Sequence, residues 1–205
     1  MSENTNNNIV EECAEVKAPR QPFVLSILEF VEMFVIIVLS VLLIFTFGMR
    51  LCTVNGASMN QTLYHGETLI TTNLFYTPKQ DDIIVFHQTG NDTYSLNEPV
   101  VKRVIATEGQ HVKIDYSVPN TMTIWVDGVK YADTHAYYDP TRSIIFPQYD
   151  YEYGDQSFEV TVPEGHLFVM GDNRNNSKDS RSLAIGFVDQ RRVIGKCVYK
   201  MNSNE

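Results

Sequence analysis

The chain of 205 residues has few cysteines, few histidines and a deficit of positive charge. Three cysteines, an odd number, do not make the disulfide framework of a small secreted domain. The five histidines are scattered without the spacing of metal ligands. Sixteen lysines and arginines against 25 acids give a net charge of −9, which excludes a globally basic nucleic-acid binder. A hydrophobic content of 43% is too high for a disordered chain. These averages describe an acidic soluble domain, but they hide an uneven distribution.

Charge is missing altogether from Met33–Met49, a run of 17 residues. A bilayer core of roughly 30 Å needs about 20 helical residues. Extending the run back to Phe30 supplies them and places Glu32 near one interface. Residues 1–22 are polar and have no helical or strand periodicity, so we expect a disordered tail there. The sequence therefore predicts a transmembrane anchor within residues 23–50.

Three other interpretations of this apolar run fit less well. A cleaved signal peptide has a basic start and a core of roughly 7–15 residues, whereas this run is longer and follows an acidic tail. A lipoprotein signal needs small residues before its cysteine, but Arg50 and Leu51 precede Cys52. A buried core helix should carry a polar stripe, and this run has none. Two cations, Lys17 and Arg20, precede the run and one, Arg50, follows it. This excess favours a cytoplasmic N-terminus.

Residues 51–205 form the remaining domain, and their pattern is that of a mainly β protein. The sequence shows no long amphipathic helix and no internal repeat. Short segments rich in Val and Ile are separated by Gly, Pro, Asn and Asp. The expected strands are Thr68–Thr72, Asp82–His87, Pro99–Ala106, His111–Asp115, Met122–Val126, Ser157–Val162, His166–Met170 and Val193–Tyr199. Residues 134–154, rich in Tyr and Asp, are expected to be a long loop or an insertion.

The expected strand Pro99–Ala106 carries one cation on each face. Alternate residues of a strand share a face, so Lys102 shares its face with Val100 and Val104, and Arg103 lies on the other. A lysine drawn into such apolar surroundings has a lowered pKa and can act as a general base. The alternative is an edge strand from which Lys102 reaches water, and this strand taken alone favours that alternative.

A serine follows two small residues shortly after the apolar run. Gly56 and Ala57 leave the backbone before Ser58 open to close approach by another chain. Ser58 could therefore be a nucleophile whose own N–H faces a developing oxyanion. Most Gly-x-Ser sequences are simple turns, so this motif alone is a weak signal.

The third segment, residues 171–181, follows the apolar run Leu167–Met170. Its eleven residues include Asp172, Arg174, Lys178, Asp179 and Arg181. One interpretation is a solvated loop with Asx turns. The other is an Asp–Arg network that fixes a loop beside a site, where a hydroxyl orients a lysine amine.

In this order behind one apolar span, the three segments closely resemble the bacterial type I signal peptidases, which are membrane-anchored serine proteases with a Ser–Lys dyad. The resemblance runs from about Phe30 to Tyr199. It rests on Gly56-Ala57-Ser58-Met59 before Thr62-Leu63, Asp82-Ile83-Ile84-Val85-Phe86, Lys102-Arg103-Val104-Ile105 with Gly109, Trp125-Val126-Asp127-Gly128, Val162-Pro163-Glu164-Gly165, Gly171-Asp172-Asn173-Arg174 and Asp179-Ser180-Arg181. The resemblance implies twisted antiparallel sheets, a fold related to that of self-cleaving repressors.

The resemblance also implies roles for single residues. Ser58 is expected to be the nucleophile, Lys102 its general base, and Ser177 a hydrogen-bond partner of the Lys102 amine. The residues expected to hold the surrounding loop are Asp172, Arg174, Asp179 and Arg181. The implied substrates are secretory precursors with an Ala-x-Ala signal, cleaved on the outer side of a bacterial cell membrane. Residues that flank the dyad and could line shallow subsites are Val54, Met59, Leu63, Val100 and Val101. We expect no metal or other cofactor, no nucleic-acid partner, and a monomer in contact with membrane lipid.

The sequence departs from the family pattern in three places. Gln61 stands where the family usually has Pro, and residues 106–110 replace a Gly-x-Pro-Gly-Asp turn. Many relatives carry Ser at the position of Gly56, and its hydroxyl helps to stabilise the oxyanion. With Gly56 here, the oxyanion hole must rest on backbone N–H groups, chiefly that of Ser58.

Three alternative functions remain open at this point. One is another Ser–Lys peptidase, such as a self-cleaving repressor, although a membrane span stands where its DNA-binding domain would be. Another is a non-enzymatic, membrane-tethered β-domain, for example a pilus or precursor-binding module. The third is a peptidase dedicated to a subset of precursors such as pilins.

Overall fold

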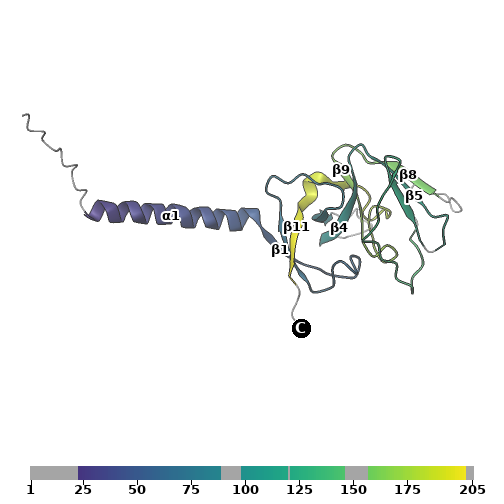
Figure 1. The fold of residues 1–205 in the computed structure, drawn as a ribbon, viewed down its shortest axis with the longest axis horizontal. Coiled ribbons are helices and arrows are strands. Elements are labelled where there is room, and N and C mark those ends of the chain that lie inside the picture. The colour runs from purple at the N-terminus through teal and green to yellow at the C-terminus, as the bar shows by residue number, and fades with distance from the viewer. Residues whose placement is uncertain (1–22, 89–97, 120, 146–156, 202–205) are drawn as a thin grey trace, which may run out of the picture. The chain divides into compact units, whose positions relative to one another are not determined.

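The computed structural model describes residues 23–88, 98–119, 121–145 and 157–201 (Figure 1). The expected disordered tail and the second part of the expected loop at 134–154 lie outside the described residues. The chain divides into two compact units, Met1–Leu42 and Leu43–Glu205.

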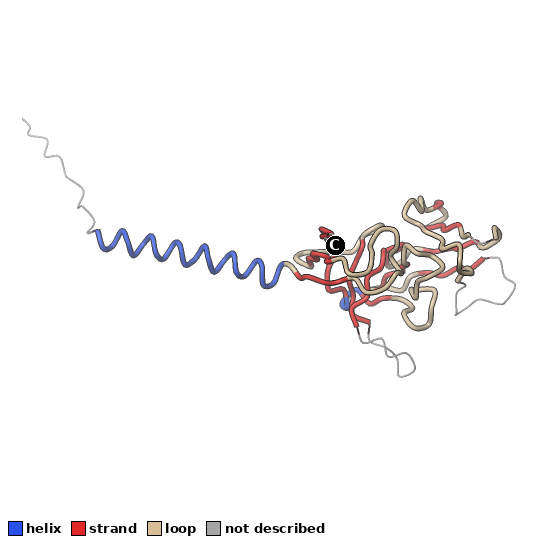
Figure 2. Tube along the Cα trace, turned by 90° about the horizontal axis from the view of Figure 1, so that it is seen from below, coloured by secondary structure: helices blue, strands red, loops and turns tan. Residues whose placement is uncertain are grey.

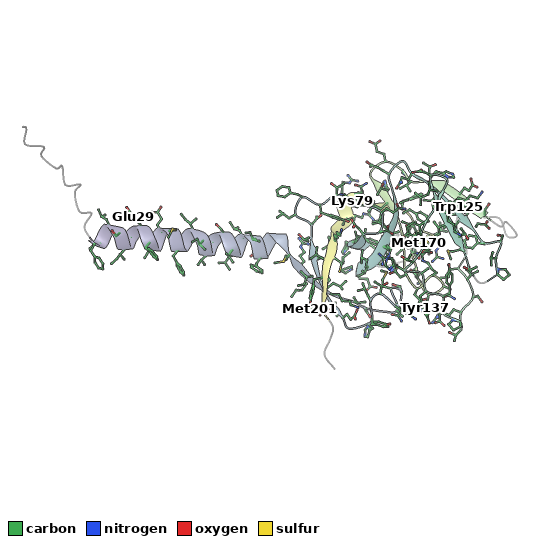
Figure 3. The ribbon with its side chains drawn as sticks, in the orientation of Figure 1. Glu29, Lys79, Trp125, Tyr137, Met170 and Met201 are labelled. Carbon is green, nitrogen blue, oxygen red and sulfur yellow. The ribbon has the colours of Figure 1, made fainter. Side chains whose placement is uncertain are left out.

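A single long helix, α1 (Phe23–Gly48), contains the apolar run. It begins ten residues before the charge-free segment, because Glu29 and Glu32 are good helix formers and do not interrupt it. Side chains project on all sides of α1, Glu29 among them (Figure 3), and none of those described up to Phe45 is buried. The helix is long and apolar enough over Phe23–Thr46 to cross a membrane. Apolar exposure all round is consistent with a membrane anchor.

The rest of the described chain folds into two antiparallel sheets, which are red in Figure 2. The larger sheet has the order β1-β2-β11-β3-β4-β9-β10, and the smaller has the order β7-β6-β5-β8. The strands of the larger sheet are β1 (Arg50–Thr53), β2 (Thr68–Thr72), β3 (Ile83–Gln88), β4 (Glu98–Thr107), β9 (His166–Met170), β10 (Val188–Asp189) and β11 (Val193–Met201). Those of the smaller sheet are β5 (His111–Asp115), β6 (Thr123–Val126), β7 (Val129–Lys130) and β8 (Ser157–Thr161). One turn of 3₁₀ helix, Gln190–Arg192, precedes β11.

The burial of each strand follows its place in these sheets. Strands β2, β5 and β6 alternate between buried and half-buried residues, as strands with one covered face do. By contrast, β4 is continuously buried over residues 102–106 and β9 over residues 167–170, because apolar clusters cover both faces of the larger sheet there. One cluster joins the two sheets and includes Ile105, Phe158 and Phe168.

The structure confirms a mainly β fold with one N-terminal apolar helix. The expected strands are present, and β2, β5 and β9 have the expected bounds. Strands β1, β7 and β10 were not predicted, because two to four residues are too short to show alternation. The edge-strand alternative for Lys102 is wrong, since β4 pairs with β3 on one side and β9 on the other. Lys102 therefore projects from the middle of the sheet.

Candidate active site

Ser58 lies in a tight turn that follows β1. The turn is closed by the Leu63 N–H, which donates to the Met59 carbonyl over 2.9 Å. Met59 and Leu63 are themselves buried with Val54 in one apolar cluster. Gly56 has φ +98°, a backbone conformation that favours glycine and lets the chain bend ahead of the serine. The buried residues thus hold the turn, and Ser58 stays partly exposed.

Lys102 reaches this turn from the centre of β4. Its Nζ lies 2.7 Å from Ser58 Oγ and donates to the Val101 carbonyl over 2.9 Å. Lys102 is 3% exposed, and it lies opposite Ile84 in the register between β4 and β3. The two residues, 44 positions apart in the chain, meet because the turn after β1 folds back over the middle of the sheet.

Burial lowers the pKa of the Lys102 amine to about 8. The carboxylates of Asp179 and Asp172 act in the opposite direction and limit the fall. A buried ammonium loses its hydration, and this loss outweighs the attraction of the two acids. The amine is therefore neutral in a useful fraction of molecules near neutral pH, which a general base requires.

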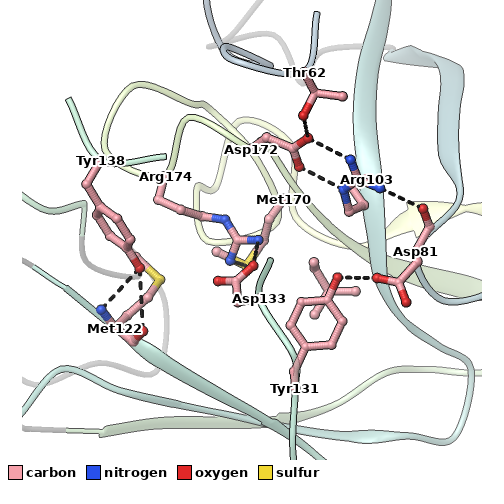
Figure 4. Close-up of polar contacts among 12 residues, drawn as sticks. Thr62, Asp81, Arg103, Met122, Tyr131, Asp133, Tyr138, Met170, Asp172 and Arg174 are labelled. Atoms are coloured by element: carbon pink, nitrogen blue, oxygen red, sulfur yellow. Dashed lines mark hydrogen bonds and ion pairs between the residues drawn. The ribbon is translucent and has the colours of Figure 1, made fainter. Parts of the chain in front are cut away.

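The second cation of β4, Arg103, lies on the opposite side of the strand and is paired. Its Nε and one terminal nitrogen donate to the two Asp172 oxygens over 2.8 and 2.7 Å, a bidentate geometry (Figure 4). Its other terminal nitrogen donates to the Asp81 carbonyl over 2.9 Å. The Thr62 hydroxyl donates to the same Asp172 carboxylate over 2.5 Å. Asp172 thereby joins the nucleophile turn to β4.

The other expected loop residues are buried and also form ion pairs. The Arg181 guanidinium donates to both Asp179 oxygens, through Nε and one terminal nitrogen, each over 2.8 Å. Arg174 pairs instead with Asp133, at 2.5 Å, from a segment outside the loop (Figure 4). Burial opposes ionisation of Asp179, but Arg181 overcomes it and keeps the pKa of that carboxyl below its ordinary value. Asp179 therefore remains charged beside Lys102.

Ser177 and Gly171 pack closely against the nucleophile turn. A Cβ on Gly171 would collide with the Ser177 side chain and with the Ser58 carbonyl oxygen, so only glycine fits there. The Ser177 hydroxyl is buried and has no hydrogen-bond partner in the described structure. It is nevertheless close enough to Asp179 to help lower the pKa of that residue. The expected Ser177–Lys102 hydrogen bond is not formed in this structure.

The described part of the expected long loop packs against residues 171–181. Tyr137 and Asn173 form a bridge in which the Arg174 N–H donates to the Tyr137 carbonyl over 2.8 Å. The Asn175 amide nitrogen donates to the Asp139 and Arg142 carbonyls, each over 2.8 Å. Residues within 134–145 thus hold the loop through backbone and amide hydrogen bonds.

A pocket of about 170 Å³ opens beside Ser58 and Lys102. It is lined by Thr53, Val54, Asn55, Ser58, Met59, Glu98, Pro99, Val100, Val101, Lys102, Lys178 and Ile185. Four of the five residues expected to line subsites are in this lining, whereas Leu63 is buried in the adjoining cluster. A larger hollow of about 490 Å³, lined in part by Arg50, His87 and Arg192, shares no residue with it and contains no member of the dyad.

Sequence reasoning did not assign several groups that the structure brings to the site. The partners of the loop, Arg103, Thr62 and Asp133, come from three separate segments. Asn173 was noticed only as part of a motif. The presence of one cation on each face of β4 indicated that Arg103 could need a partner. The sequence around Arg103 did not identify that partner, Asp172. Among the described residues, no group of three His, Cys, Asp or Glu side chains could hold a metal ion. The groups present suit acyl transfer through a serine.

Comparisons with known proteins show the family of the chain. A family model described as signal peptidase, peptidase S26, matches residues 27–201. A probable signal peptidase I-1 from Synechocystis is 34% identical over 149 residues, which cover 70% of this chain and 66% of that protein. Signal peptidase IB from Staphylococcus aureus is 30% identical over 189 residues, which cover 84% of this chain and 89% of that protein. A crystal structure of a signal peptidase I from Enterococcus faecalis V583 is 27% identical with a TM-score of 0.41, covering 60% of this chain and 98% of that one.

Proposed function

The chain belongs to the signal peptidase family, peptidase S26, and we propose that Ser58 and Lys102 carry out its serine-peptidase reaction. The observation that supports this most directly is the 2.7 Å approach of Lys102 Nζ to Ser58 Oγ, made by an amine that is buried and easily deprotonated. Nucleophile and base within hydrogen-bond reach are the minimum that such chemistry needs.

In the proposed reaction, the neutral Lys102 amine accepts the Ser58 hydroxyl proton as Oγ attacks the scissile carbonyl. The resulting ammonium gives its proton to the leaving amine, the C–N bond breaks, and an ester to Ser58 remains. Water then attacks the ester and gives a proton to Lys102, which returns it to Oγ as the acid leaves. The charge of Asp179 and Asp172 favours the ammonium at the moment it forms.

The oxyanion of each tetrahedral intermediate needs a donor near Ser58. The Ser58 N–H makes no hydrogen bond in the described part of the chain and is free for this role. Gly56 offers no hydroxyl, and its φ of +98° disfavours any side chain there. Backbone donation alone is the oxyanion stabilisation we infer here.

The substrates we propose are secretory precursors cut after an Ala-x-Ala motif. The pocket beside the dyad is small, and five of its twelve lining residues are Val54, Met59, Val100, Val101 and Ile185, which suits short apolar side chains. We also infer that α1 anchors the chain in a bacterial cell membrane, with the N-terminus in the cytoplasm and the β-domain outside. The excess of Lys17 and Arg20 over Arg50 supports this orientation.

The assay that tests the dyad uses the purified full chain with an Ala-x-Ala precursor, beside Ser58→Ala and Lys102→Ala. We expect each variant to lose at least about 10³-fold in kcat/KM, because nucleophile and base act as one unit. A variant at an exposed lysine of β5, Lys113→Ala, is the matched control and should cleave normally. A wild type no faster than Ser58→Ala would refute the proposal.

A further inference from the structure

We propose that Asn173 is a positioning residue that aims the Ser58 N–H at the developing oxyanion, an inference that rests on the proposed function. Asn173 follows β9 in the loop 171–181 and is 1% exposed. It was not assigned a role by the sequence motifs, and it is not in contact with the base. Its contacts converge instead on the two peptide groups that flank the nucleophile.

Both carbonyls around Ser58 accept hydrogen bonds from Asn173. The side-chain nitrogen Nδ2 donates to the Ala57 carbonyl over 3.0 Å. The backbone N–H donates to the Ser58 carbonyl, also over 3.0 Å. The Ala57 carbonyl has a second donor, the Asn60 N–H at 3.2 Å, but that bond is internal to the turn and moves with it. The Asn173 amide is therefore what holds this peptide to the rest of the site.

The planarity of the peptide group turns this contact into an orientation. In a trans peptide the C=O and N–H of one unit point in opposite directions. The Ala57 carbonyl and the Ser58 N–H belong to one unit, so fixing the carbonyl toward Asn173 fixes the N–H away from it. A donor on the carbonyl also polarises the peptide and strengthens its N–H as a donor. An oxyanion donor works only if it is oriented before the reaction.

The unpaired half of the Asn173 amide supports a role beyond packing. Its Oδ1 is buried without a hydrogen-bond partner in the described structure. Asn175, two positions along the same loop, uses both halves of its amide, since its Oδ1 accepts from the Asp139 N–H over 2.8 Å and its Nδ2 donates twice. A residue kept only for stability should be satisfied as Asn175 is, or be apolar. Asn173 instead keeps one donor directed at the nucleophile turn.

The test compares Asn173→Leu with the matched control Gln88→Met in the full chain. Gln88 of β3 is also buried, and its Nε2 donates to a backbone carbonyl outside the loop 171–181, that of Ala184, over 3.0 Å. Each replaces a buried amide by an apolar group of similar size, and each keeps the backbone N–H. For Asn173→Leu we expect kcat to fall about 10–100-fold with KM within about twofold, a transition-state effect somewhat smaller than deletion of an oxyanion donor. The acid limb of the pH profile should not move, because Lys102 is untouched. For Gln88→Met we expect kcat close to that of the wild type.

A second measurement separates orientation from general damage. A peptide aldehyde forms a tetrahedral adduct with the nucleophile, whereas the corresponding peptide alcohol does not. In Asn173→Leu, inhibition by the aldehyde should weaken in parallel with kcat, while inhibition by the alcohol stays unchanged. If thermal melting shows that Asn173→Leu is unfolded, Asn173→Asp replaces it in the test. The kcat of Asn173→Asp is then compared with that of the wild type at a pH above the acid limb of the variant. This substitution keeps the shape of Asn173 but removes the donor.

The proposal is overturned if the folded variant keeps wild-type kcat, or if aldehyde and alcohol lose affinity equally. It is also overturned if Gln88→Met lowers kcat as much as Asn173→Leu. None of these outcomes bears on the proposed roles of Ser58 and Lys102. Those roles are refuted only if Ser58→Ala and Lys102→Ala remain active. An inactive Ser58→Ala beside a fully active Asn173→Leu would remove this inference and leave the proposed function standing.

Discussion

Two opposing effects act on the pKa of the Lys102 amine, and burial is the stronger of the two. Burial in the centre of the sheet disfavours its charge, and the carboxylates of Asp179 and Asp172 restore part of it. With a pKa of about 8, about one tenth of the molecules carry the neutral base at pH 7. The same residue placed at the sheet edge would keep its proton and could not accept one from Ser58.

The pH dependence of the reaction follows from this balance. We expect kcat/KM to rise through an acid limb centred near pH 8, losing about tenfold per pH unit below it, because only the neutral amine is active. The measurement is a kcat/KM profile with a short peptide substrate between about pH 5 and pH 9. Lys113→Ala should leave the limb in place. A flat profile across this range would contradict a lysine base.

Three ion pairs involve the loop 171–181, two of them with residues outside it and one within it. Asp172 reaches Arg103 on β4, Arg174 reaches Asp133, and Asp179 pairs with Arg181 within the loop. Both members of the last pair are fully buried. Removing one partner therefore leaves a charge without hydration or a counterion.

The stability of this loop gives an element-scale prediction. Asp179→Asn should lower the free energy of unfolding by about 3–5 kcal/mol, because Arg181 is left as an uncompensated buried cation. The matched control is Asp189→Asn, which breaks a pair whose Arg191 is 89% exposed and should leave the free energy of unfolding unchanged. The measurement is denaturant unfolding followed by circular dichroism. Equal stability of the two variants would show that the buried pair does not hold the loop.

The two units of the chain carry separate tasks. The three buried clusters of the β-domain contain no residue of the unit Met1–Leu42. The domain therefore has the core it needs without the helix. Only eight residues, Arg50–Ala57, separate the end of the apolar run from Ser58, and fully extended they span at most about 28 Å. A helix in the bilayer would thus keep the nucleophile near the membrane surface.

Removal of the anchor tests this arrangement at the scale of the whole molecule. A chain that begins at Arg50 should fold and cleave a short soluble peptide within about twofold of the full chain, because the dyad is intact. Cleavage of a membrane-embedded precursor should fall at least about tenfold, since the anchor no longer raises the local concentration of enzyme at the membrane. Vesicles carrying the precursor provide the assay. Equal losses on both substrates would mean that the helix does not serve to co-localise them.

Patterns along the chain were sufficient for the features that depend on near neighbours. The charge-free run and the polar tail before it predicted an apolar helix within residues 23–50, and α1 spans Phe23–Gly48. Alternation predicted the longer strands and missed β1, β7 and β10. The pattern of β4 taken alone favoured an edge strand. This was wrong, because the sequence of one strand does not indicate which strands pair with it.

The sequence by itself determined the long apolar helix, the β-rich domain and, through the order of its motifs, the serine and lysine to test. Only the tertiary structure decided which groups meet: Lys102 with Ser58 across 44 positions, Asp172 with Arg103 across 69, and Asn173 with Ala57 across 116. The physical reason is that periodicity reports which face of a strand is buried. The partners on that face, and with them the pKa of Lys102 and the direction of the Ser58 N–H, depend on sheet order and on loop packing between distant segments.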